Sequence, residues 1–328
     1  SIPSIDRFVR NGALPFVGRA AQLEQITRLW HDIEAATLRA ALLVGEAGSG
    51  KSRLVEEAIR RIAAADGAVV HARLRPEESA SIGPVLALAM WGSESAGPLL
   101  KQEPEGTIPA VAAALQRIAG LRRTLLVIED IHLLHGITLR EFAILLDLLA
   151  DDPLAILCTS RPAELDARAL LQPFIREEIA LAGLQREDLA QLWRELFGDR
   201  ANPEALQAME RATLGNPLAF RSALRGAINS GAMRMEEATN IWRVSLAPAA
   251  FAEVVGRTAQ RISEGMISHL SDVELHAAQM LGVLGESFSF ESATLLLPGA
   301  EAMLPRLVEQ GVIARGVGGW YPLNGVAS

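Results

Sequence analysis

Residues 45–52 have the sequence GEAGSGKS, which combines three glycines with a lysine and a final serine. The three glycines allow the backbone to curl until several N–H groups point at one phosphate. Lys51 could then reach the outer phosphates of a nucleotide, and the Ser52 hydroxyl could bind Mg²⁺. A glycine-rich turn with a chance lysine is the alternative, but an apolar run before it and a helical pattern after it favour a phosphate loop. We therefore expect contacts to ATP from Gly45, Glu46, Ala47, Gly48, Ser49, Gly50, Lys51, Ser52 and Arg53.

Two carboxylates follow a second apolar run at residues 125–130, which have the sequence LLVIED. A buried strand here would deliver both acids at its carboxyl end, where ligands bind in parallel sheets. We expect Glu129 to hold Mg²⁺ through its water shell and Asp130 to orient or deprotonate the attacking water. A solvated acidic turn after a strand is the alternative interpretation.

A third polar group, TSRP at 159–162, ends another apolar run. Arg161 could contact the γ-phosphate, because a planar guanidinium binds phosphate oxygens in pairs. The alternative is a surface arginine before a turn proline. His132 and His135 could bind a metal ion, but a Mg²⁺-nucleotide already accounts for the nearby carboxylates. Cys158 lies within the apolar run, and we expect it to be a small core residue.

Short apolar runs alternate with helical patterns along the first half of the chain. The runs lie at 39–44, 68–72, 124–128 and 154–159. This alternation predicts the α/β class, with a parallel sheet covered by helices on both faces. After residue 165 we expect no further strand of this sheet, because 186–231 has broken helical patterns. Residues 250–328 return to helices before a short β-like end, and residues 1–14 are interpreted as a linker.

The composition limits the classes of function. Half of the 328 residues are hydrophobic, and the net charge of −8 disfavours direct DNA binding by this segment, while a local basic patch stays open. The one cysteine excludes an intramolecular disulfide. We find no signal peptide and no apolar run of about 18 residues, so we expect a cytoplasmic protein without a membrane span. The chain begins without Met, and we interpret it as part of a longer polypeptide.

These segments resemble those of STAND-type P-loop ATPases, within the wider AAA+ group. FVGRAAQLE at 16–24 resembles the FVGRxxEL start of such domains. GEAGSGKSRL at 45–54 is similar to the loop of bacterial predicted ATPases and large LuxR-type transcription regulators. LVIEDIH at 126–132 resembles their Walker B segment, and GNPL at 215–218 resembles an element of their helical lid. Residues 231–285 are similar to the stretch that leads into their winged-helix domain.

The resemblance implies that Val17 and Arg19 flank the adenine and that Pro217 packs on the base or ribose. It also implies three modules: a P-loop domain at 15–165, a helical lid at 166–232 and a winged helix at 233–328. Two positions depart from the family. Leu133-Leu134-His135 replaces the family's W-A-D, so a third acid is absent. Asn324 stands where the family often has His, which puts a winged-helix contact to the nucleotide in question.

The function implied by the resemblance is that of a regulatory switch. It would bind ATP or ADP with Mg²⁺, hydrolyse ATP slowly, and be closed with ADP but open and oligomerising with ATP. Its partners would be copies of itself or sensor and effector domains of the same longer signalling or transcription-control protein. The rival interpretation is a DNA-handling AAA+ ATPase of the origin-recognition or clamp-loader type. The acidic charge and GNPL at 215–218, in place of an arginine sensor, argue against it. A small-molecule P-loop kinase is a third interpretation, which the lid and tail disfavour.

Overall fold

The computed structural model divides into two compact units, Arg19–Ala182 and the combination of Ser1–Gly18 with Gly183–Ser328. The residues that it describes are 4–33, 37–74, 81–162, 166–198, 202–236, 241–265, 273, 276–277, 280–281, 289–297, 299–309, 313–316 and 319–322. Asn324, the residue expected to replace a nucleotide-contacting histidine, lies outside them.

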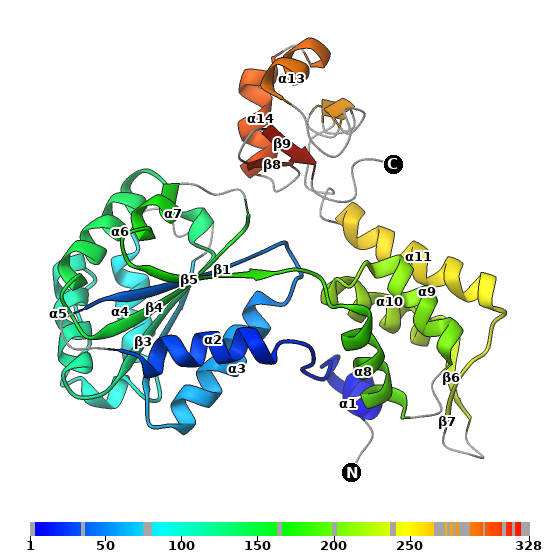
Figure 1. Ribbon diagram of the computed structural model, residues 1–328, viewed down its shortest axis with the longest axis horizontal. Helices are drawn as coiled ribbons and strands as arrows, with labels where there is room; N and C mark the ends of the chain where they lie inside the picture. Colours follow the sequence, from blue (N-terminus) through cyan, green and yellow to red (C-terminus); the bar gives the residue numbers. More distant parts are fainter. Residues whose placement is uncertain are drawn as a thin grey trace. The chain divides into compact units, whose positions relative to one another are not determined.

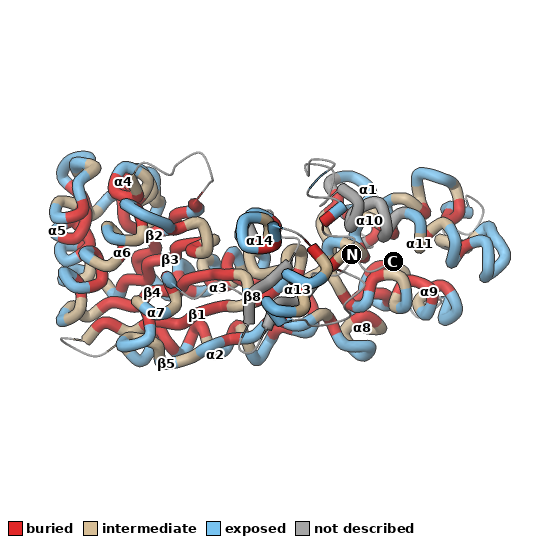
Figure 2. Tube along the Cα trace, turned by 90° about the horizontal axis from the view of Figure 1, so that it is seen from above, coloured by how far each residue is buried: buried red, intermediate tan, exposed pale blue. Residues whose placement is uncertain are grey.

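Parallel strands form the sheet of the unit Arg19–Ala182 (Figure 1). The five strands have the order β2-β3-β4-β1-β5. The strands are β1 (Arg39–Gly45), β2 (Ala68–Arg73), β3 (Thr124–Glu129), β4 (Leu154–Ser160) and β5 (Ile175–Leu181). The first four are the predicted apolar runs. Every residue of β3 and β4 is buried, as expected for central strands covered on both faces (Figure 2).

The expectation that no further strand of this sheet follows residue 165 is wrong. β5 pairs with β1 and forms an edge of the sheet, from Ala40 beside Ile175 to Gly45 beside Leu181. Its sequence, IREEIAL, alternates between exposed and more buried residues, because an edge strand is open to solvent. Such a strand lacks the continuous apolar run by which the other four were found. The predicted lid boundary at 166 therefore falls before α7 and β5, which belong to the unit with the sheet.

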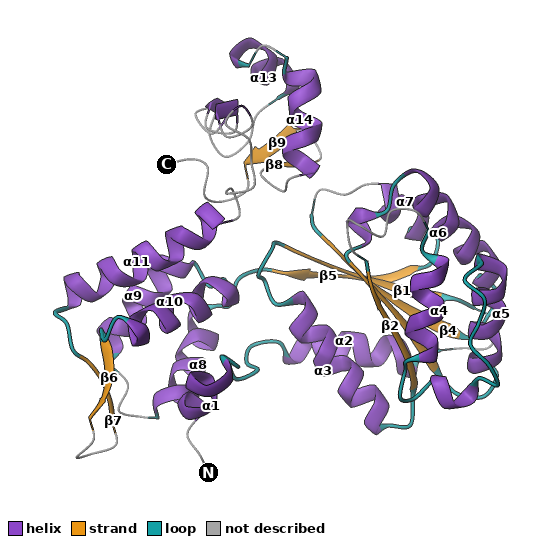
Figure 3. Ribbon diagram, turned by 180° about the vertical axis from the view of Figure 1, so that it is seen from behind, coloured by secondary structure: helices purple, strands orange, loops and turns teal. Residues whose placement is uncertain are grey.

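Helices cover both faces of this sheet (Figure 3). On one face lie α2 (Ala20–His31) and α3 (Lys51–Ala64). On the other lie α4 (Gly83–Trp91), α5 (Ile108–Ala119), α6 (Gly136–Leu149) and α7 (Asp166–Leu171), with the short helices η2 (Gly97–Leu99) and η3 (Ile131–Leu133) in the connections. Alternate strand residues, such as Leu42, Val70 and Leu126, join α4–α7 in one apolar core. The predicted α/β class with a doubly covered parallel sheet is confirmed.

Helices dominate the second unit. Up to residue 265 they are α1 (Ser4–Asn11), α8 (Arg186–Phe197), α9 (Pro203–Thr213), α10 (Pro217–Asn229) and α11 (Pro248–Gly265). In the same region β6 (Met233–Glu236) pairs with β7 (Ile241–Val244). Residues 1–14 are therefore not only a linker, because Ile5 and Phe8 on α1 are buried in the same core as Trp193 and Phe220. That short apolar pair is too brief to stand out as a helical pattern.

The breaks between the helices have local causes. Leu214 and Gly215 both have positive φ, which ends α9, and the Asn216 side chain accepts hydrogen bonds from the N–H groups of Leu218 and Ala219. Pro217 then occupies the first turn of α10, where its missing N–H costs nothing. The helices broken at Gly215-Asn216-Pro217 were predicted from these residue types.

The C-terminal elements have a core of their own. Helices α13 (Phe290–Leu296) and α14 (Ala300–Glu309) bury Ala293, Leu304 and Leu307 together. They precede an antiparallel pair, β8 (Ile313–Gly316) and β9 (Gly319–Pro322), which matches the predicted β-like end. Helices followed by a hairpin are the arrangement expected of a winged helix. None of the helices in the described ranges is long and apolar enough to cross a membrane.

Candidate nucleotide and magnesium site

The loop at 45–52 connects the carboxyl end of β1 to the first turn of α3. Gly48 and Gly50 have φ values of 77° and 97°, in the left-handed region that glycine adopts without strain. Gly45 is constrained differently, because a Cβ there would lie 2.6 Å from Ser49 Oγ and 2.9 Å from the Leu181 carbonyl oxygen. The backbone therefore curls at the amino end of α3, where N–H groups and the helix dipole favour an anion.

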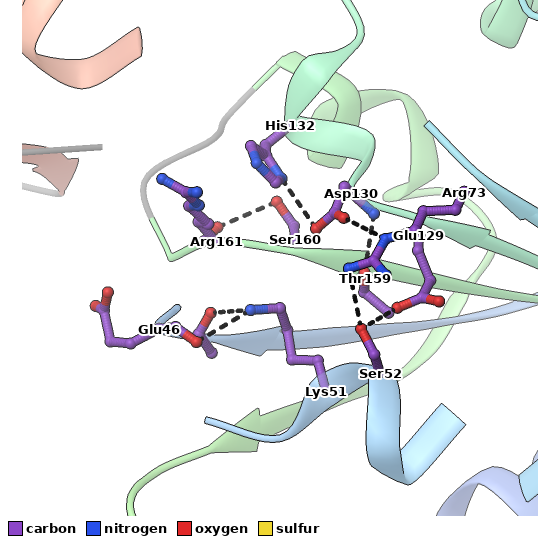
Figure 4. Close-up of polar contacts among 11 residues, drawn as sticks. Glu46, Lys51, Ser52, Arg73, Glu129, Asp130, His132, Thr159, Ser160 and Arg161 are labelled. Atoms are coloured by element: carbon purple, nitrogen blue, oxygen red, sulfur yellow. Dashed lines mark hydrogen bonds and ion pairs between the residues drawn. The ribbon is translucent and has the colours of Figure 1, made fainter. Parts of the chain in front are cut away.

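Lys51 begins α3 and folds back over the loop (Figure 4). Its Nζ donates hydrogen bonds to the carbonyl oxygens of Gly45, at 2.7 Å, and Glu46, at 3.1 Å. Burial lowers the pKa of Lys51, although Asp130 and Glu129 oppose this shift. Among the described residues, the ammonium thus has only neutral hydrogen-bond acceptors, and an anionic phosphate is a stronger partner for it.

Glu129 and Ser52 join the strand tip to the phosphate loop. The Ser52 hydroxyl donates to Glu129 Oε2 over 2.6 Å, and His71 Nε2 lies 2.7 Å from Glu129 Oε1. Only 2% of Glu129 is exposed. Burial raises the pKa of its carboxyl, but the hydrogen bonds from His71 and Ser52 outweigh burial, and the pKa lies below its usual value. A buried acid that stays ionised beside a serine hydroxyl is suited to a divalent cation.

Asp130 follows β3 in a left-handed conformation, with φ 64°. Its N–H donates to Thr159 Oγ1 at the end of β4, over 2.9 Å. Arg73 Nε donates to Asp130 Oδ2 and Arg73 Nη2 to Ser52 Oγ, each over 3.4 Å. The conformation turns the Asp130 side chain away from that of Glu129, so two adjacent acids have separate surroundings (Figure 4).

His132 and Arg161 lie on the other side of Asp130 (Figure 4). His132 Nδ1 is 3.8 Å from Asp130 Oδ1, too far for a hydrogen bond, and this buried nitrogen has no hydrogen-bond partner among the described residues. Burial and the charge of Arg161 lower the pKa of His132 to about 4, with Asp130 opposing and Lys51 adding to the shift. Arg161 is thus close enough to influence both His132 and Lys51.

The remaining predicted residues have varied surroundings. The buried Arg19 donates through Nη2 to the carbonyl oxygens of Ser49, at 3.3 Å, and Ala182, at 2.6 Å, and so ties the loop to the end of β5. Arg53 is half-exposed and pairs with Glu56 at 3.2 Å. Val17 and Pro217 belong to the second unit, so their expected contacts to the adenine and ribose stay predictions.

Two site residues, His71 and Arg73, were missed by the sequence analysis. Both lie on β2, whose residues Arg73 and Ala72 stand beside Glu129 and Ile128 in the sheet. The signal was present in AVVHAR at 68–73, where polar side chains alternate with apolar ones toward the end of a strand. The sequence does not show which strand lies beside β3, so the partners of these side chains could not be assigned.

The structure does not support the alternative in which His132 and His135 bind a metal ion. His135 Nδ1 lies 2.7 Å from the Leu133 carbonyl oxygen, and the described residues contain no group of three or more His, Cys, Asp or Glu arranged to hold a metal ion. Ser52 Oγ and Glu129 Oε2, at 2.6 Å, are instead the hard oxygen donors that suit Mg²⁺ alongside nucleotide phosphates. Cys158 is fully buried, and burial raises the pKa of its thiol, as expected for a core residue.

Comparison with known families shows the family to which the chain belongs. The AAA ATPase domain family matches residues 15–274, which include both the loop and the acids. The chain belongs to this family. As an AAA ATPase it binds ATP and ADP, and ATP hydrolysis is the activity that the family implies. That the loop at 45–52 contacts the nucleotide stays a prediction. None of the curated proteins matches the sequence.

Solved structures show the fold of this AAA ATPase over its whole length. The Aeropyrum pernix ORC2 protein, solved in ADPNP–ADP complexes, aligns with a TM-score of 0.64 at 14% identity, covering 100% of this chain and 96% of its own. The ORC1 protein from the same organism, in complex with DNA, has a TM-score of 0.55 at 15% identity and covers 96% and 91%. A STAND protein with a tetratricopeptide repeat sensor from Pyrococcus horikoshii covers 96% of this chain and 43% of its own, at 17% identity, and its TM-score of 0.41 supports no argument.

Proposed function

We propose that this AAA ATPase hydrolyses Mg²⁺-bound ATP and uses the nucleotide state to control binding to DNA. The observation that carries the hydrolytic part is the 2.6 Å contact between Ser52 Oγ and Glu129 Oε2, which brings the phosphate loop and the acids of β3 together. Mg²⁺ bound near Ser52 and Glu129 would neutralise phosphate charge.

Each side chain has a separate part in the proposed reaction. Lys51 would exchange its two carbonyl partners for β- and γ-phosphate oxygens. Asp130 would accept a proton from the water that attacks the γ-phosphorus, while the bond to the β–γ bridging oxygen breaks and ADP leaves. Arg161 would stabilise the charge on the transferred phosphoryl group. Thr159 holds the backbone of Asp130 and so fixes the starting point of that side chain.

DNA as the partner is supported by the similarity to origin-recognition proteins along the whole chain, one of them solved with DNA. The acidic composition of the C-terminal part limits how many DNA phosphates it can contact. Residues 233–328 contain six arginines, no lysine and ten acidic residues. We therefore propose a narrow contact to two or three phosphates, which predicts that log K falls with log salt with a slope of about −2 to −3.

A STAND-type switch is the second candidate. The sequence segments FVGR at 16–19, GEAGSGKSRL at 45–54 and GNPL at 215–218 support it, as does the acidic composition. In that case the output is self-association or a contact to sensor and effector domains, and DNA has no part.

Fluorescence anisotropy with labelled duplex DNA, in ADP and in a non-hydrolysable ATP analogue, separates the two candidates. Affinity that depends on the nucleotide and falls with salt supports the DNA proposal. Failure to bind DNA in either nucleotide, together with ATP-dependent self-association in sedimentation, would replace it by the STAND-type switch. Absence of ATP hydrolysis in the presence of Mg²⁺ would contradict the catalytic part of both.

A further inference from the structure

His71 lies on the face of β2 that points toward α3. Its neighbours Val70 and Ala72 belong to the apolar core with α4–α7, and successive strand residues point to opposite faces of a sheet. His71 therefore lies on the same face as Glu129, on the adjacent strand, with its Nε2 2.7 Å from Glu129 Oε1. About a third of the His71 side chain is exposed, whereas Glu129 is nearly fully buried.

The two carboxylate oxygens of Glu129 have hydrogen-bond partners that would behave differently when Mg²⁺ binds. Oε2 accepts from the Ser52 hydroxyl, whose oxygen must turn toward Mg²⁺ if the site works as proposed. Oε1 accepts from His71, which lies on β2, the strand paired with β3. When Ser52 releases Oε2, His71 is left as the side chain that fixes the carboxylate in orientation.

Arg73, which also lies near Glu129, does not replace His71. Arg73 contacts Asp130 Oδ2 and Ser52 Oγ, and hydrogen bonds to Glu129 come, among the described side chains, from Ser52 and His71. Loss of His71 would therefore leave a buried carboxylate oxygen without its hydrogen bond, and the side chain could rotate.

We infer that His71 is a positioning residue for the Mg²⁺-side carboxylate, an inference that rests on the proposed function. It holds Glu129 Oε1 so that Oε2 stays beside Ser52, where the two residues would hold Mg²⁺. Groups that orient a metal-binding side chain typically change metal affinity by about 10- to 100-fold when they are removed. The affinity for the nucleotide alone depends on the loop and Lys51, and should not change.

Three variants isolate this hydrogen bond. His71→Leu removes it. His71→Gln places an amide nitrogen where Nε2 lies, and His71→Asn keeps a polar side chain that is too short to reach Glu129. His31→Leu is the matched control, because His31 is exposed and lies far from Glu129. Its carbonyl oxygen accepts from Arg123, which precedes the amino end of β3, whereas Glu129 lies at the carboxyl end of that strand. Thermal unfolding of each variant verifies that it is folded.

Mn²⁺ binding to the complex of protein and ATP analogue, measured by electron paramagnetic resonance, is the main readout, and nucleotide affinity in EDTA is the second. We expect the Kd for Mn²⁺ to rise about 10- to 100-fold in His71→Leu and His71→Asn. His71→Gln and His31→Leu should stay near wild type, and all variants should bind nucleotide equally in EDTA. Three results would each overturn the positioning role of His71 and leave the proposed function standing. They are wild-type Mn²⁺ affinity in folded His71→Leu, equal losses of Mn²⁺ affinity in His71→Gln and His71→Leu, and a matching loss of nucleotide affinity in EDTA. If the wild-type complex binds no Mn²⁺, the proposed metal site itself is wrong.

Discussion

The Ser52 hydroxyl donates a 2.6 Å hydrogen bond to Glu129 Oε2, although the two residues are 77 positions apart in the chain. Ser52 lies in the first turn of α3, and Glu129 is the last residue of β3. The contact exists because the carboxyl ends of parallel strands meet at one edge of the sheet. It places one carboxylate beside the phosphate loop and leaves Asp130, the next residue, with different neighbours.

Asp130→Asn separates the roles of these two acids. Removal of the proposed base should slow ATP hydrolysis by about 10²- to 10⁴-fold with little change in ATP affinity, because the amide keeps the shape of the side chain. Asp151→Asn, at an exposed position in the turn before β4, is the control. Steady-state phosphate release measures the rate, and calorimetry measures the affinity. Hydrolysis by Asp130→Asn at the wild-type rate would mean that the base is another residue.

Glu129→Gln should act on the metal instead of the base. The neutral amide lacks the charge that attracts a divalent cation, so we expect a higher Mg²⁺ concentration for half-maximal hydrolysis and a smaller change in the rate at saturating Mg²⁺. A Mg²⁺ titration of the hydrolysis rate tests this. If Glu129→Gln shows a wild-type Mg²⁺ requirement, the roles of the two acids are not divided as proposed.

His132 should reduce stability in acid. Its pKa in the folded protein is about 4, below the ordinary value of 6.5. The unfolded chain takes up a proton below about pH 6.5, whereas the folded chain does so only near pH 4, so the free energy of unfolding falls across this range by up to about 3 kcal/mol. His132→Gln should remove that part of the acid sensitivity. Urea unfolding without nucleotide, at pH 7.5, 6 and 5, measures it.

His31→Gln, at an exposed position, provides the comparison. The difference between His132→Gln and wild type should move in favour of the variant as the pH falls. A difference that is constant from pH 7.5 to 5 would show that His132 is not held in its neutral form by its surroundings.

Arg161→Ala tests whether the nucleotide controls the conformation of this protein. Only ATP offers this side chain a γ-phosphate, so it can favour one conformation only in the ATP state. We expect small-angle scattering and sedimentation to differ between ADP and a non-hydrolysable ATP analogue in wild type, and the difference to disappear in Arg161→Ala. A preference of about 1.4 kcal/mol changes the population ratio tenfold, so a modest shift is sufficient.

Arg176→Ala, exposed on the edge strand β5, is the control for Arg161→Ala and should behave as wild type. Identical profiles of the wild-type protein in both nucleotides would mean that this chain alone is no switch. A difference that persists in Arg161→Ala would assign the γ-phosphate contact to another residue.

The elements that carry the site were predictable because their patterns are local. A run such as LLVIED and a loop such as GEAGSGKS each contain their own signal. β5 was missed because an edge strand with Arg176, Glu177 and Glu178 has no apolar run, and its place in the sheet is decided by pairing with β1. Helix α1 was missed because its buried face consists mainly of Ile5 and Phe8.

Within the site, too, local patterns were predictable and contacts between strands were not. Lys51, Ser52 and the two acids were predicted from local motifs and from the apolar and helical patterns that flank them. The contacts of His71 and Arg73 to those residues depend on β2 lying next to β3, which is a property of the sheet order and not of any single segment. The low pKa of His132 likewise depends on its burial in the folded protein and then on the charge of Arg161, which follows β4.

Lys51 provides the most direct test of ATP binding, because Lys51 and Lys101 are the only lysines in the chain. Lys51→Ala removes the loop's ammonium, and the exposed Lys101→Ala removes an equal charge elsewhere. Titration calorimetry with ATP and Mg²⁺ should show wild-type affinity for Lys101→Ala and a loss of at least about tenfold for Lys51→Ala, since a hydrogen bond between charged groups contributes about 1.5–3 kcal/mol. Wild-type affinity in a folded Lys51→Ala protein would contradict the assignment of this loop as the ATP site.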